Sequence, residues 1–175
     1  MSRFAGRGFD GLWFWFCALH IPITILLDLQ TIYPKHWLAD TYLSALFEWS
    51  ITLARDPILG GAISKTREFA WLQYFFFLEG GFQLPCFIIG AICLWRNDKR
   101  VYPLLLAYGA STATTLIPCL GAIFTANPKP PLTTKEMITL LSEYVPFLLI
   151  PLGMAVDMGI KLTKIVSMAQ DRKRV

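Results

Sequence analysis

Two acidic residues lie inside long apolar stretches of the chain, where a carboxyl group can bind a cation or transfer a proton. Asp28 lies near the end of the run Gly11–Leu29, and Glu79 lies in the middle of the run Phe69–Trp95; neither run contains Lys or Arg. A carboxylate at the centre of a bilayer is unfavourable by roughly 2.5–3.5 kcal/mol on insertion scales, so an intramembrane acid marks a functional site by default. These acids must be protonated, share a proton, or meet a positive charge that a ligand supplies.

Polar side chains at helical spacing accompany both acids. His20 and Thr24 precede Asp28 by eight and four residues, which places the three on one helix face. Gln83 follows Glu79 by four residues and shares its face in the same way. If the two acids face each other, desolvation and like-charge repulsion favour one shared proton. Such a pair suits a cationic amine with an apolar body, or it can act as a proton donor.

Prolines interrupt the apolar segments. A proline inside a helix removes a backbone donor and frees a carbonyl, so the helix bends there. Four bent helices with inward polar stripes indicate a cavity, although such stripes more often form interhelical hydrogen bonds than ligand contacts. The prolines to which we assign this supporting role are Pro22, Pro85 and Pro118, and the polar and aromatic candidates of the later segments are Thr114, Tyr144 and Phe147.

Composition and segment length predict a membrane protein. The 175 residues are 55% hydrophobic and 16% charged, whereas about 25% charged residues is usual for a soluble domain. We expect an all-α protein with one domain, residues 1–175, and a cap on the last helix at Thr134. The expected membrane spans are residues 11–30, 69–95, 101–126 and 138–162, and the mixed segment 36–55 is expected to lie at the membrane interface.

The distribution of charge predicts orientation and argues against several partners. Ten of the 16 Lys and Arg residues lie in residues 1–10, 96–100 and 161–175, so the positive-inside rule places both termini in the cytoplasm. The net charge of +4 forms no single basic patch, and we expect no nucleic-acid partner. The four cysteines form no C-x-x-C pair and there are only two histidines, so we expect neither a metal nor a cofactor.

Five short strings, in order along nearly the whole chain, closely resemble EXPERA-domain proteins of the sigma-2 receptor type. This family also contains the emopamil-binding sterol isomerases, which are more distant. The strings are HIPITILLDLQ at residues 20–30, DPIL at 56–59, EGGFQLP at 79–85, TTLIP at 114–118 and YVPFLLIP at 144–151.

The resemblance implies a four-helix bundle in the endoplasmic reticulum membrane, often a homodimer, with a pocket that opens sideways to lipid. It implies that Asp28 pairs with a ligand amine, that Glu79 is hydrogen-bonded to it, and that Asp56 supports the site from a loop. Gln83, Thr114 and Tyr144 match pocket positions of the family. The family pattern has a second tyrosine where this chain has Phe147.

Three functions remain open on these grounds. The leading hypothesis is a protein that binds sterols, oxysterols or cationic amphiphiles and takes part in sterol homeostasis or trafficking. The alternative is a sterol isomerase-like enzyme that uses the buried acids as proton donor and cation stabiliser; we favour a protein that is not an enzyme and name no catalytic residue. The third is an accessory protein that stabilises a membrane-protein partner.

Overall fold

The computed structural model describes residues 3–38, 41–63, 67–126 and 128–173, and the regular structure in these ranges is entirely helical. Four of its helical segments are long and apolar enough to cross a membrane: Asp10–Thr31, Arg67–Trp95, Lys99–Thr125 and Thr134–Arg172. The protein is therefore an all-α membrane protein with four spans.

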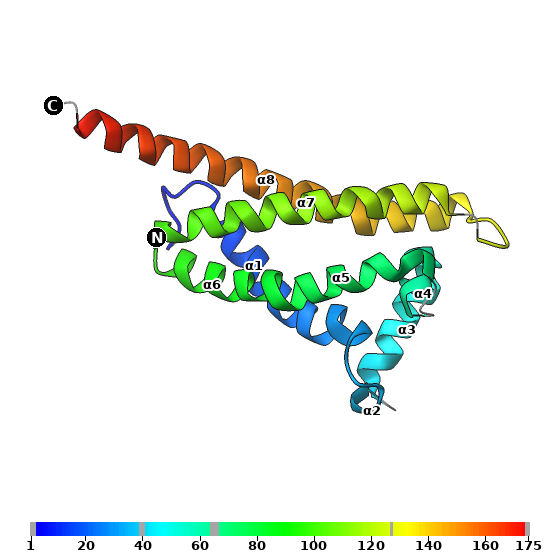
Figure 1. The fold of residues 1–175 in the computed structure, drawn as a ribbon. Coiled ribbons are helices and arrows are strands. Elements are labelled where there is room, and N and C mark those ends of the chain that lie inside the picture. Colours follow the sequence, from blue (N-terminus) through cyan, green and yellow to red (C-terminus); the bar gives the residue numbers. More distant parts are fainter. Residues whose placement is uncertain (1–2, 39–40, 64–66, 127, 174–175) are drawn as a thin grey trace.

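The spans pack as two pairs. Helix α1 (Asp10–Leu26) crosses α6 (Leu84–Trp95), and α7 (Tyr102–Thr125) runs antiparallel along α8 (Thr134–Arg172), which continues past the bundle (Figure 1). Gly109 brings α7 and α8 close together, because a Cβ there would collide with the carbonyl oxygen of Pro151. Small residues allow this approach in membrane bundles, where packing rather than the hydrophobic effect joins helices.

The segment between the first two spans forms short helices gathered at one end of the bundle (Figure 1). The expected interfacial segment 36–55 is divided between two helices, and residues 39 and 40 within it lie outside the described residues. Thr41 begins the longer helix, accepting a 3.3 Å hydrogen bond from the Ser44 amide. The helices of this segment are α2 (Lys35–Leu38), α3 (Tyr42–Ala54) and α4 (Pro57–Ile63).

The second span changes its helical form halfway. It begins with η2 (Arg67–Phe69) and α5 (Ala70–Leu78), passes through the π-helical turn η3 (Glu79–Gln83), and continues as α6. Phe76 of α5 belongs to one apolar cluster, with Leu140 of α8, whereas Phe87 of α6 belongs to another, with Trp13 of α1. The π turn thus joins two half-spans that pack in different parts of the core.

A buried ionic network ties the start of α1 to the other spans. Asp10 is 1% exposed; its carboxylate accepts hydrogen bonds from Lys161 at 2.6 Å, from Tyr102 at 3.1 Å and from Arg7 at 3.1 Å. Asp157 accepts from Lys161 at 2.7 Å. The sequence patterns gave no indication of this network, since its members are up to 151 positions apart.

The cap of α8 lies one residue before the predicted one. Thr133, not Thr134, is the N-cap: its hydroxyl accepts from the Glu136 amide at 3.3 Å, and Glu136 accepts from the Thr133 amide at 2.7 Å. An N-cap residue has extended backbone angles, and Thr133 has them while Thr134 is already helical.

Candidate functional site

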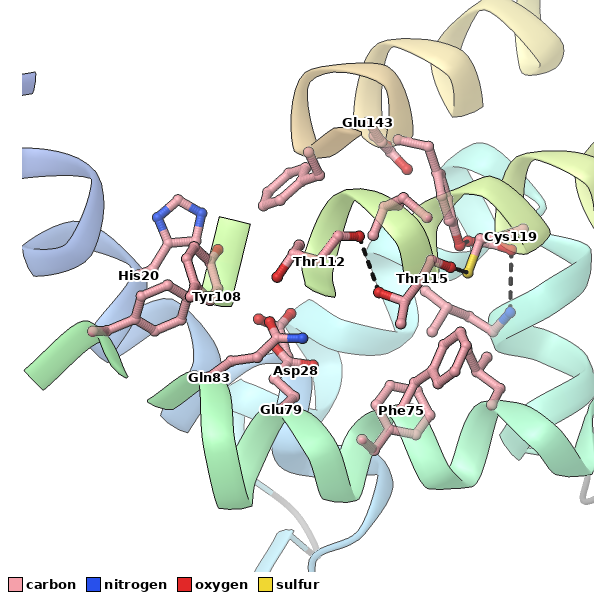
Figure 2. A pocket seen from close by; sticks show the side chains of 18 of the residues that line it. His20, Asp28, Phe75, Glu79, Gln83, Tyr108, Thr112, Thr115, Cys119 and Glu143 are labelled. Carbon is pink, nitrogen blue, oxygen red and sulfur yellow. Dashed lines mark hydrogen bonds between the residues drawn. The ribbon is translucent and has the colours of Figure 1, made fainter. Parts of the chain in front are cut away.

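A cavity of about 300 Å³ lies among the spans and the short helices. Four acids line it, namely Asp28, Asp56, Glu79 and Glu143, and no Lys or Arg is among its described lining residues. Figure 2 shows these walls, with Asp28, Glu79 and Gln83 together and Glu143 entering from α8. The remainder of the wall is largely apolar and aromatic.

Asp28 and Glu79 lie next to each other in the structure. Their carboxyl groups lie close enough to form a hydrogen bond with each other when one of them is protonated. The hydroxyl of Thr24, a side chain 1% exposed, lies 3.3 Å from Oε1 of Glu79 and 3.4 Å from Oδ2 of Asp28, so it can donate to either. The pair therefore carries at most one negative charge while this hydrogen bond is present.

Local backbone form brings the two acids together. Helix α1 ends at Leu26, and Asp28 begins a 3₁₀ turn, η1 (Asp28–Thr31), rather than continuing the α-helix. Glu79 is the first residue of the π turn, a form often found at functional sites. Gly80 lets the two turns approach, since a Cβ there would stand 3.3 Å from a methyl group of Leu29.

Asp56 and Tyr144 form a second polar contact in the cavity wall. Asp56 is 4% exposed, and its Oδ1 accepts from the amides of Ile58 at 2.8 Å and Leu59 at 3.1 Å, which starts α4. Its Oδ2 accepts a 2.6 Å hydrogen bond from the Tyr144 hydroxyl. Asp56 thus supports the wall from the loop before α4 and holds Tyr144 in place.

The other residues predicted for the first span divide between wall and support. His20 lines the cavity; its Nδ1 lies 2.7 Å from the Phe16 carbonyl, and its Nε2 is buried without a hydrogen-bond partner. Its ring lies 5.5 Å, centroid to centroid, from Phe147, which also lines the cavity. Thr24 does not line the cavity but holds the acid pair, and Pro22 lies inside α1.

Gln83 also lines the cavity, at the end of the π turn. Pro85 follows it near the start of α6, so the break expected at this proline takes the form of a π turn. Pro118 lies inside α7, between the lining residues Leu116 and Cys119.

The structure does not bring Thr114 into the cavity. Thr114 is exposed and its hydroxyl donates to the Ala110 carbonyl at 2.8 Å. Tyr108, Thr112 and Thr115 line the cavity instead, at spacings of four and three residues. One step along an α-helix turns a side chain by about 100°. The polar stripe predicted through Thr114 therefore lies on a helix face next to the one that lines the cavity.

Sequence reasoning also missed Glu143 as a wall residue. In the structure it is an exposed side chain that also lines the cavity, so the cavity is open at this residue. The part of the chain that the structure describes contains no group of three metal-ligating side chains.

The fold and the cavity define a four-span helical membrane protein with an acid-lined pocket between its helices. The chain belongs to the EXPERA (EXPanded EBP superfamily) family, whose model matches residues 34–158. It is similar to sigma intracellular receptor 2 of Xenopus tropicalis, with 31% identity over 158 residues, 87% of this chain and 88% of the relative. The Homo sapiens protein of that name is 33% identical over 141 residues, 75% of this chain and 76% of the relative.

The chain is also similar to a fungal protein that has a different name. The chain is 30% identical over 159 residues to efficient mitochondria targeting-associated protein 19 of Schizosaccharomyces pombe, covering 89% of this chain and 77% of the relative.

Proposed function

We propose that this protein binds sterols, oxysterols and cationic amphiphiles in the cavity and takes part in sterol homeostasis or trafficking. The observation that supports the proposal is the hydrogen-bonded pair of Asp28 and Glu79, which lines a cavity without Lys or Arg among its described lining residues. An ammonium group in a weakly polar pocket is stabilised by a carboxylate far more than in water. The apolar wall accommodates the body of the ligand.

Equilibrium binding to the purified protein in lipid nanodiscs tests this proposal. The probes are a tertiary amine on a polycyclic hydrocarbon body and a hydroxylated sterol. Asp28→Asn is expected to weaken amine binding by about tenfold or more, because it removes the charge-assisted contact. Amine binding that is unchanged in Asp28→Asn would refute the proposed role.

Asp98→Asn is the matched control for this experiment. Asp98 lies between two spans, away from the cavity lining, and the adjacent Arg100 guanidinium lowers the pKa of its carboxyl to about 2. It is therefore ionised at neutral pH, so the control removes one negative charge as well, and amine affinity should not change.

A sterol double-bond isomerase is the second candidate. The pairing of Asp28 with Glu79 favours it, since one protonated carboxyl group can protonate an alkene, and the partner carboxylate can stabilise the resulting cation and accept the proton that it loses from a neighbouring carbon. Incubation of the protein with an 8-ene sterol, followed by product analysis, separates the candidates. A shifted double bond supports the enzyme, and unchanged sterol supports the binding protein.

We also propose the endoplasmic reticulum membrane as the location, with both termini cytoplasmic, and a homodimer as the assembly. The excess of Lys and Arg in the terminal and 96–100 segments supports the orientation. Trp37 and Trp49, 63% and 59% exposed, support an interfacial position for α2 and α3. Protease protection of terminal tags in microsomes tests the orientation. A partner membrane protein would be found by crosslinking in native membranes.

A further inference from the structure

The four acids of the cavity form two separate groups. Asp28 and Glu79 are joined by their shared hydrogen bond, and Asp56 lies near enough to Glu143 for their charges to interact. Asp56 is satisfied by Tyr144 and two backbone amides. Glu143, within the described part of the chain, makes no hydrogen bond or ion pair, and its exposed side chain lines the cavity.

Glu143 is not at the end of its span. It lies nine residues after the start of α8 at Thr134, or roughly 14 Å along the helix axis at 1.5 Å per residue. In Figure 2, Glu143 enters the pocket from α8. Asp28 and Glu79, which belong to η1 and η3, lie on the opposite side of the pocket in this view.

A second polar group in the same wall is also unsatisfied. Thr112 is 5% exposed and lines the cavity, and its Oγ1 makes no hydrogen bond with the described residues, although the Tyr108 hydroxyl lies nearby. Buried polar side chains almost always have a partner. A buried hydroxyl without a partner in a cavity wall is a binding position for a polar group of a ligand.

We infer that the cavity contains a second cation subsite at Glu143 and that it binds elongated dications, with an amine at each end of an apolar body. This inference rests on the proposed function, because one amine occupies the Asp28–Glu79 end. The second amine pairs with Glu143, and the Thr112 hydroxyl accepts a hydrogen bond from an ammonium group. Apolar side chains of the cavity wall, such as Leu116 and Phe76, contact the body of the ligand.

The test compares two probes of the same shape. One is a hydrocarbon with an amine at both ends, and the other is the monoamine in which a methyl group replaces the second amine. Their dissociation constants are measured on the full chain in nanodiscs. The dication is expected to bind up to about fivefold more tightly, which is the upper end for an ion pair with an exposed carboxylate.

Glu143→Gln should reduce the ratio of the two dissociation constants to near one, whereas Glu68→Gln should leave the ratio as it is. Glu68 is an exposed acid at the start of the second span, outside the cavity lining, so it is the matched control. Glu143→Val, which also removes the charge, should give the same ratio as Glu143→Gln. Monoamine binding shows in each variant that the protein is folded.

The outcomes separate the two proposals. If the monoamine binds but the dication has no advantage, or if the advantage persists in Glu143→Gln, the second subsite is refuted and the proposed function stands. If neither amine binds the unmodified protein, the proposed function fails and the second subsite fails with it.

Discussion

The hydroxyl of Tyr144 donates a 2.6 Å hydrogen bond to Oδ2 of Asp56, joining the last span to the loop that begins α4. The same carboxylate accepts from two backbone amides through its other oxygen. One side chain thus fixes both the start of a short helix and the position of an aromatic ring in the cavity wall.

Tyr144→Phe should lower the free energy of unfolding by about 1–3 kcal/mol, because it leaves a buried carboxylate oxygen without its donor. Thermal unfolding in detergent measures the change. Tyr74→Phe is the control, since Tyr74 is 74% exposed and lies outside the cavity lining. Equal melting temperatures for the two variants would contradict the role given to the Asp56 contact.

Asp10→Asn should destabilise the protein by about 3 kcal/mol or more, because removing one partner of a buried ion pair leaves uncompensated charge. Lys161 and Arg7 both donate to this carboxylate. Asp171→Asn, at an exposed position near the end of α8, should change the unfolding free energy little. The network would be structurally unimportant if both variants unfolded alike.

Gly109→Ala should separate α7 from α8 and destabilise the protein by about 1–3 kcal/mol, as overpacking does. Gly121 lies on the same helix, and a Cβ there meets nothing within 4 Å. Gly121→Ala should therefore be neutral or slightly stabilising, since Ala favours helix over Gly. Unfolding measured side by side for the two variants gives the contrast, and a neutral Gly109→Ala would show that the helices are not held this closely.

Thr112→Val should raise the stability of the ligand-free protein by about 1 kcal/mol, because it removes a buried hydroxyl that lacks a partner. It should also weaken ligands that hydrogen-bond to that hydroxyl. Thr114→Val tests the alternative face of α7, since the Thr114 hydroxyl donates to the Ala110 carbonyl of its own helix. A larger loss of ligand affinity in Thr114→Val than in Thr112→Val would restore the sequence-based assignment.

Periodicity and apolar length were enough to predict the four-span all-α fold. They were also enough to select Asp28 and Glu79, since unpaired acids in apolar runs stand out without any structure. The contact between them depends on a 3₁₀ turn and a π turn, neither of which has a reliable pattern in a single sequence.

Helix phase was the weaker part of the prediction. Thr114 and Thr112 are both in a polar stretch, and an offset of two residues decides which of them faces the cavity. The contact of Asp10 with Lys161 joins the first and last spans, and no local spacing encodes it. Glu143 was passed over because its role depends on which side of α8 faces the other three spans.

The π turn at Glu79–Gln83 has a consequence for how this protein tolerates length changes. A π turn holds one residue more than the α-helical turn that it replaces, so the two half-spans are out of phase by about 100°. Deleting one residue at Gly80 or Gly81 would restore a continuous helix, and Phe76 and Phe87 could no longer both face their present clusters. The position of Glu79 in the cavity wall thus depends on this one extra residue. Deleting that residue would remove the site but leave the hydrophobicity of the second span almost unchanged.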